Sequence, residues 1–342
     1  MPSGSERCIP GRRERGAGGT GDAAGRAGES RTAGGGAPAP AGRSELPPVT
    51  GRQARSERAT LRRLTLPALA VYLLFVVGPV AAAAALSLFD WDGIGPIRFV
   101  GLEQYGRALF RDPIFARSWL NNGIYVAITL VTEVGFGLLF AAALQARLPL
   151  PGFWRALFFS PMVLSMVVVG LLWSFVLNPE FGLLNQTLRR VGLAAWAQPW
   201  LGDDRTALAA ISLVSGWRYA GFYMALYAAG LRRIPPEVLE AARLDGAGEV
   251  FLFRRITLPL LAPVTAVAVL LCVTGGFQAF DLFFVMTDGG PFHGTETPAL
   301  WMIKKGFNRQ SLGYGAALGV LLALTVGLAG WAQQRLRGSR PE

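Results

Sequence analysis

Long apolar runs alternate with short polar stretches over most of this chain. The first run, from Leu66 to Phe89, has 24 residues without a charge. An α-helix rises 1.5 Å per residue, so this run can cross a hydrocarbon core of about 30 Å. Similar runs follow at about 123–144, 156–177, 207–231, 258–280 and 314–331. The pattern therefore predicts six membrane spans.

The six runs are predicted to be helices, because backbone polar groups in lipid must be hydrogen-bonded within the segment. We therefore expect an all-α membrane protein with both termini on one side. With the termini inside, the inner segments hold 15 basic residues and the longer outer loops hold ten. The positive-inside rule then favours an N-in, C-in orientation.

The N-terminal segment differs from the rest of the chain in composition. Residues 1–60 are rich in Gly, Pro, Ser, Ala and Arg and contain almost no aromatic or branched apolar residues. Such a segment cannot bury enough apolar surface to offset chain entropy. We expect a disordered basic cytoplasmic tail over 1–60, a membrane domain over 61–335 and a short cytoplasmic tail over 336–342.

Composition supports a membrane protein and limits the possible partners. Hydrophobic residues make up 52% of the chain and charged residues 16%, against about 25% charged in soluble domains. The net charge is +11, but residues 1–63 carry +6 of it and the rest is scattered between apolar runs. No basic stripe for nucleic acid is formed. One His and two Cys in different environments indicate neither a metal site nor a disulfide framework.

One predicted inner loop has the composition of a helix. Residues 235–259 begin with two prolines, which favour the first helical turn because their missing N–H has no partner there. This helix is predicted to end near Asp245. Gly246 and Gly248 would then turn the chain, since glycine adopts the left-handed conformation that ends helices. A second helical piece over 249–256 would return to the membrane.

The predicted short helix carries small residues between charged ones. Ala241 and Ala242 allow another surface to approach the backbone closely, while Glu240, Arg243 and Asp245 offer charged contacts. This pattern is typical of a docking helix. An amphipathic helix resting on lipid headgroups has the same composition, so composition alone leaves both interpretations open.

Seven positions of this loop keep a distinctive spacing. They are Glu240, Ala241, Ala242, Gly246, Ile256, Leu258 and Pro259. The pattern resembles the EAA loop in permease subunits of bacterial binding-protein-dependent ABC importers. In that family the loop forms a coupling helix that seats in a cleft of the cytoplasmic ATPase subunit. The resemblance implies that these residues, together with Asp245, contact an ATPase.

Segments outside the loop resemble the carbohydrate-importer branch, sugar permeases that usually work as unlike pairs. They are residues 86–93, 99–105, 158–185 and 277–291. The resemblance covers most of residues 66–332 and implies the type I permease fold of ABC importers. It also implies a second permease subunit in a heterodimer, a cytoplasmic ATPase dimer, an extracytoplasmic solute-binding protein and a bacterial inner-membrane location. Glu133, a charge within the second run, is unexpected.

No ATP-binding site is predicted in this chain. It has no Gly-rich run followed by Lys and Ser or Thr, and its two lysines, Lys304 and Lys305, follow no phosphate-binding loop. We therefore expect a non-enzymatic pore subunit without catalytic residues or cofactors, with ATP and Mg bound by the partner ATPase. ATPase closure would move the coupling helix and switch the pore between inward-open and outward-open states.

Polar and aromatic residues within the spans are candidates for a sugar path. A polar group at membrane depth needs a partner or a water-filled cavity, and sugars suit aromatic faces combined with amide or carboxylate groups. The candidates are Tyr219, Phe222 and Tyr223, beside Trp217, in the fourth run, and Gln278 and Asp281 near the end of the fifth. Each could instead pack in the bundle or anchor its interface. Asp281 could also brace the span end by pairing with Arg218.

Two further titratable residues receive structural interpretations. For Glu133 a structural ion pair is favoured over a role in transport, and His293 is expected to be a solvated loop residue. Two rival functions need other features. A secondary transporter needs matching interrupted spans in its two halves, and a membrane enzyme needs converging His, Cys or acidic groups. The sequence shows neither, and it favours an importer of a mono- or oligosaccharide or a related polyol.

Overall fold

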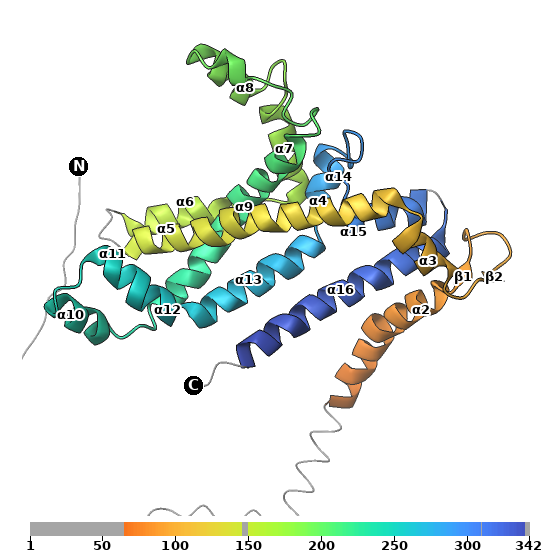
Figure 1. Ribbon diagram of the computed structural model, residues 1–342, viewed down its shortest axis with the longest axis horizontal. Coiled ribbons are helices and arrows are strands. Elements are labelled where there is room, and N and C mark those ends of the chain that lie inside the picture. The colour runs from red at the N-terminus through yellow and green to blue at the C-terminus, as the bar shows by residue number, and fades with distance from the viewer. Residues whose placement is uncertain (1–64, 146–149, 309, 339–342) are drawn as a thin grey trace, which may run out of the picture. The chain divides into compact units, whose positions relative to one another are not determined.

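The computed structural model describes residues 65–145, 150–308 and 310–338, and the structural statements below refer to these residues. The expected tail over 1–60 lies outside them. Helices dominate the described part, as predicted for an all-α protein (Figure 1). One small hairpin was not predicted. It pairs β1 (Phe89–Asp90) with β2 (Arg98–Phe99) in antiparallel register, with Phe89 opposite Phe99.

The helical elements follow one another along the chain with short connections. In chain order they are η1 (Leu73–Val77), α2 (Gly78–Leu86), α3 (Glu103–Phe110), α4 (Pro113–Thr129), η2 (Leu130–Gly135), α5 (Phe136–Gln145), α6 (Pro151–Val163), α7 (Met166–Val176), α8 (Leu183–Arg190), η3 (Ala194–Trp196), α9 (Ala207–Leu231), α10 (Pro236–Leu244), α11 (Glu249–Leu252), η4 (Phe253–Thr257), α12 (Leu258–Leu260), α13 (Ala262–Phe277), α14 (Asp281–Met286), α15 (Pro298–Ile303), η5 (Lys304–Asn308) and α16 (Leu312–Gly338). The η elements are π-helical turns, except η3, which is a 3-10 helix.

Three helical stretches are long and apolar enough to cross a membrane: Thr65–Leu86, Pro113–Gln145 and Leu312–Arg335. The count of candidate spans rises to five if α6 with α7, and Glu249–Leu260 with α13, each form one bent span. The fourth apolar run forms α9, a single helix of 25 residues, 15 of which are buried. This helix is long enough to cross a membrane but is less apolar than the candidate spans. A helix surrounded by other helices can carry polar residues that lipid would not tolerate.

The third apolar run is broken, although the sequence predicts one span there. The axes of α6 and α7 meet at 99°. Pro161 within α6 has no N–H to donate, and Leu164 and Ser165 are extended, each with ψ of 142°. Arg218 of α9 donates to the carbonyl oxygens of Met162 (3.3 Å) and Leu164 (2.9 Å). The guanidinium thereby satisfies part of an open helix end.

Helix α9 lies among α4, α5, α6 and α13 at the centre of the bundle (Figure 1). A Cβ at Gly221 would overlap with the carbonyl oxygen of Phe158. Glycine is therefore required for the close approach of α6 to α9, as small residues allow in membrane bundles. The apolar core around α9 includes Ile211 and Tyr227 of α9 itself and Phe283 of α14, each fully buried.

The first span, Thr65–Leu86, contributes almost nothing to this core. Its most apolar window is 0% buried, and side chains such as Phe75 are 70% exposed. It packs mainly against α16. Its outer surface is left for lipid or another chain.

Candidate functional site

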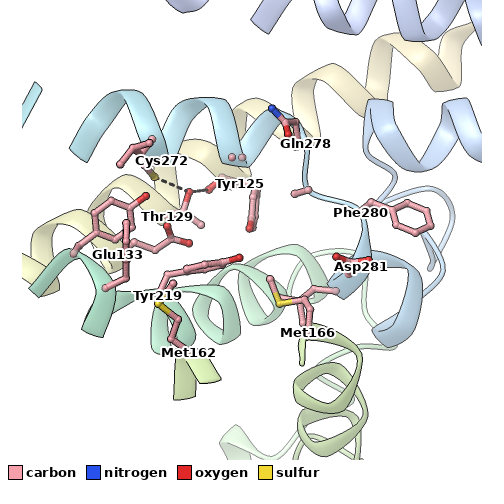
Figure 2. A pocket seen from close by; sticks show the side chains of 17 residues that line it. Tyr125, Thr129, Glu133, Met162, Met166, Tyr219, Cys272, Gln278, Phe280 and Asp281 are labelled. Carbon is pink, nitrogen blue, oxygen red and sulfur yellow. Dashed lines mark hydrogen bonds between the residues drawn. The ribbon is translucent and has the colours of Figure 1, made fainter. Parts of the chain in front are cut away.

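A cavity of about 400 Å³ opens beside α9 (Figure 2). This volume is within the range of small-molecule sites. Its walls come from α4 and η2, from the break between α6 and α7, from α9, and from the link between α13 and α14. All five side chains predicted for the sugar path line it, namely Tyr219, Phe222, Tyr223, Gln278 and Asp281. The structure thus gathers candidates from two distant parts of the chain around one space.

Glu133 lines the same cavity, and the expected ion pair is wrong within the described residues. The side chain is 5% exposed. Its Oε1 accepts a hydrogen bond from Ser215 Oγ at 2.8 Å. Tyr125 Oη lies 2.9 Å from the same Ser215 oxygen. Because the single hydroxyl proton of Ser215 goes to Glu133, Tyr125 is the donor in the second bond. The result is a buried chain of hydrogen bonds that ends on a carboxylate.

The sequence contains a signal for this wall of the cavity. Tyr125, Thr129 and Glu133 are spaced four residues apart, so they share one face of a helix. All three line the cavity. Met162 and Met166 also line the cavity. The sequence contains no signal for them, because the break between α6 and α7 brings them to the cavity wall.

Neither Trp217 nor Arg218 lines this cavity. Trp217 packs edge-on against Trp173, with ring centroids 5.5 Å apart, and faces a separate apolar cavity of about 420 Å³. The alternative that Asp281 pairs with Arg218 is wrong in the described part of the chain, since the Arg218 guanidinium donates to backbone carbonyls of the α6–α7 break instead. Asp281 is exposed at the start of α14.

The segment that resembles the EAA loop lies at one end of the bundle (Figure 1). Helix α10 begins with Pro236 and ends at Leu244, as the sequence predicts. Gly246 follows with φ of +86°. Its N–H donates to the Arg243 carbonyl and the Ala247 N–H to the Ala242 carbonyl, both at 3.0 Å. This pair of bonds is a Schellman motif, which requires a left-handed residue at the position of Gly246.

Two details of this segment differ from the prediction. Gly248 has φ of −71°, so it makes no left-handed turn. The second helical piece does not stop near Ile256. It continues through the π-helical turn η4 into α12, where Leu258 and Pro259 lie.

The segment has few internal partners. Helix α10 has no buried residue. Leu244 is 89% exposed and Val250 is 72% exposed. One ion pair, Arg243 Nε to Glu249 Oε1 at 3.0 Å, joins α10 to α11 across the turn. Glu240, Ala241 and Asp245 are also exposed. The fold therefore presents this surface without covering it.

A buried polar cluster lies at the opposite end of the bundle. Glu296 is fully buried, and its carboxylate lies 3.3 Å from Lys304 Nζ and 2.9 Å from His293 Nδ1. The side-chain amide of Asn121 donates to the carbonyl oxygens of His293 and Glu296. The prediction of a solvated His293 is therefore confirmed only in part. Its ring is 43% exposed, but the ring also contacts a buried carboxylate.

Asp112 extends the polar contacts at this end. It caps α4 by accepting from the N–H groups of Ile114 and Phe115, and it also accepts from Tyr314 Oη (2.7 Å) and Trp301 Nε1 (2.9 Å). Burial alone would raise the pKa of Asp112, but the hydrogen bonds outweigh it and the pKa lies below its ordinary value. In the β1–β2 turn, backbone N–H groups of Ile94 and Gly95 likewise lower the pKa of Asp92.

A helical bundle with a broken span, a central cavity and an uncovered helix at one end defines a membrane transport subunit. The comparisons with known proteins make this specific. Residues 133–338, more than half of the chain, match the family model of the binding-protein-dependent transport system inner membrane component. The chain belongs to that family.

Individual relatives agree with the family. The probable ABC transporter permease protein YurN of Bacillus subtilis is 41% identical over 77% of this chain and 91% of its own. The diacetylchitobiose uptake system permease protein NgcF of Streptomyces coelicolor is 31% identical over 83% of this chain and 85% of its own. The resemblance to permease subunits of carbohydrate ABC importers is confirmed.

The fold is also that of a solved importer. A crystal structure of a bacterial ABC transporter involved in the import of the acidic polysaccharide alginate superposes with a TM-score of 0.72 at 20% sequence identity. The match covers 84% of this chain and 99% of that one. The predicted permease fold of ABC importers is thereby confirmed.

Proposed function

We propose that this chain is one half of the pore of an ATP-driven importer that carries a mono- or oligosaccharide or a related polyol. The observation that carries the proposal is the cavity beside α9. In a carbohydrate-permease chain, it gathers aromatic faces, an amide and carboxylates, which are the groups that bind sugar hydroxyls. Tyr219, Phe222, Tyr223, Gln278 and Asp281 contact the passing sugar.

The chain crosses the membrane six times, with both termini in the cytoplasm. The three long helices and two bent pairs supply five spans, and α9 supplies the sixth. In support of this count, α9 spans the bundle among α4, α5, α6 and α13 (Figure 1). In this orientation the segment 235–259 faces the cytoplasm and the cluster around Glu296 faces outward.

Helix α10 and the turn at Gly246 couple the pore to a cytoplasmic ATPase dimer. Glu240, Ala241, Ala242 and Asp245 form the contact, and Ile256, Leu258 and Pro259 connect it to α13. The exposed apolar side chains of this segment support the proposal, because Leu244 and Val250 gain cover when a partner binds. ATP and Mg are held by that partner, and this subunit needs no cofactor.

Two further partners complete the importer. A second, unlike permease subunit closes the pore, and the uncovered first span and apolar faces of the bundle are surfaces for it and for lipid. An extracytoplasmic solute-binding protein delivers the sugar to the outer end.

Uptake of labelled oligosaccharides tests the proposal directly. Cells with the intact operon are compared with cells that lack only this chain, with and without depletion of ATP and with and without an ionophore. We expect uptake of at least one saccharide to require the chain and ATP and to survive the ionophore. Uptake that persists without ATP and is abolished by the ionophore would establish a secondary transporter instead.

A further inference from the structure

The charged groups around the cavity beside α9 have one sign. Glu133 and Asp281 lie on opposite sides of the space in Figure 2. Among the described residues that line the cavity, none is Lys, Arg or His. The remaining polar side chains, such as Tyr219 and Gln278, are uncharged. A ligand in this space therefore meets two acidic side chains and no basic one among the described residues of the wall.

The nearby cation does not offset this arrangement for a ligand. Arg218 is absent from the cavity wall. Its guanidinium donates to the Met162 and Leu164 carbonyls and lies 4.7 Å from the centroid of the Tyr219 ring. Both hydrogen bonds come from one guanidinium nitrogen, Nη2, which is thereby held at the helix break, while Nε is buried without a hydrogen-bond partner.

We propose that Glu133 and Asp281 make this cavity select uncharged or amine-bearing saccharides and reject anionic ones, such as uronates and sugar phosphates. Carboxylates accept hydrogen bonds from sugar hydroxyls and ammonium groups. An anionic cargo places like charges together in a partly desolvated site, which opposes its entry. The inference rests on the proposed function, since it narrows the substrate class of the same cavity.

Family membership does not decide this question. One similar protein is named for the uptake of diacetylchitobiose, an uncharged sugar, and the solved transporter of the same fold imports an acidic polysaccharide. The charge of the cargo therefore differs between proteins of one fold. In this chain, Glu133 and Asp281 are the lining residues that can act on the charge of a cargo.

The test measures the electrostatic potential in the cavity without any sugar. In the assembled importer, Met166 is replaced by Cys in a Cys8→Ser, Cys272→Ser background, which leaves one thiol on the cavity wall. Its modification rates by a trimethylammonium and by a sulfonate methanethiosulfonate reagent are measured. Their ratio is divided by the same ratio for a free thiol in solution.

We expect the ratio of the cationic to the anionic rate to exceed the free-thiol ratio by about tenfold or more. The carboxylates attract the trimethylammonium reagent and repel the sulfonate reagent. Replacing Glu133→Gln together with Asp281→Asn should return the ratio to the free-thiol value, and each single replacement should give an intermediate value. The single variants keep the test decisive if the double variant does not assemble. Glu180→Gln, which removes an exposed carboxylate outside the cavity, should change nothing.

The outcomes separate the two proposals. A ratio at the free-thiol value with intact sugar uptake would overturn the charge selection alone. A ratio that stays high in the double variant would also overturn it, as would failure of both reagents to reach Cys at position 166. A high ratio that falls in the variants, in an importer that takes up no saccharide, would support the charge assignment and overturn the proposed function.

Discussion

The two ends of the bundle are built differently, although both consist of short helices and turns. At one end, α10 has no buried residue and its contact with α11 includes one exposed ion pair. At the other, Glu296 is fully buried between Lys304 and His293, and Asp112 accepts hydrogen bonds from Tyr314 and Trp301. The first end leaves its surface uncovered, and the second holds its charged groups in ion pairs and hydrogen bonds with other residues of the same chain.

This difference indicates where each end derives its stability. A buried and hydrogen-bonded cluster holds its geometry without a partner. A helix that exposes Leu244 and Val250 gains apolar cover only in an assembly. Substitutions at the uncovered end should therefore affect coupling, while substitutions at the closed end should affect folding.

The largest effect is expected at Gly246. Gly246→Val forces a β-branched residue to adopt φ of +86°, a strain of about 1–3 kcal/mol that would open the Schellman turn and displace α11. We expect sugar uptake to be abolished and recovery of the ATPase with the tagged subunit to fall, with the amount of protein in the membrane unchanged.

Gly248→Val is the matched control for this change. Gly248 has φ of −71°, and a Cβ there meets no atom within 4 Å. The substituted side chain fits this backbone, so uptake should be retained. Normal transport by Gly246→Val would contradict the assignment of this turn to coupling.

At the closed end, Glu296→Ala should destabilise the protein by about 3 kcal/mol, because it removes a fully buried partner of the partly buried Lys304 ammonium. The measurement is the thermal unfolding midpoint of the solubilised protein. Asp288→Asn is the control. It removes the other carboxylate beside Lys304, at 3.2 Å, but that side chain is 62% exposed, so its loss should change stability by less than about 1 kcal/mol. Equal effects of the two variants would show that burial of Glu296 is unimportant.

Between the ends, single changes in the cavity should have smaller effects. Gln278→Ala and Asp281→Ala each remove one or two hydrogen bonds to a sugar, which corresponds to about a three- to tenfold loss of uptake. Assembly with the ATPase should be unaffected, as measured by co-purification. Trp217→Phe, outside this cavity, should transport normally. If both cavity variants were silent, these side chains would not form the path.

The smallest effect is a dependence of stability on pH at the closed end. The pKa of Asp112 is lower in the folded protein than its ordinary value. Its contribution is therefore complete above the ordinary value, and it is lost as the pH falls through the lower, folded value. Unfolding midpoints between about pH 6 and pH 3 should fall more steeply in the wild type than in Asp112→Asn, which keeps the helix cap without the titration. Parallel curves would contradict this role.

The sequence predicts most of the helices and the turn at Gly246, because both depend on local patterns. Apolar runs locate the helices, and the prolines and Gly246 locate α10 and its end. It fails at the third run, where the break depends on Pro161 together with Arg218, which lies 57 positions further along the chain. A hydropathy pattern does not reveal a guanidinium that caps a distant helix.

The sequence predicts only part of the cavity wall, because some of its contacts join residues that are far apart in the chain. Polar and aromatic residues at membrane depth identified Tyr219, Phe222, Tyr223, Gln278 and Asp281. For Glu133 the sequence favours a structural ion pair. Its actual partner, Ser215, is an uncharged residue on another helix. Only the packing of η2 against α9 brings the two together.

Purification of the tagged chain from its native membrane tests the central claim most directly. The co-purifying proteins are identified, and ATP hydrolysis is measured with a panel of saccharides and candidate solute-binding proteins from the same organism. The account predicts recovery of a second permease subunit and an ATPase, with hydrolysis stimulated by the sugar-loaded binding protein. Recovery of the chain alone, without ATP hydrolysis under any condition, would contradict it.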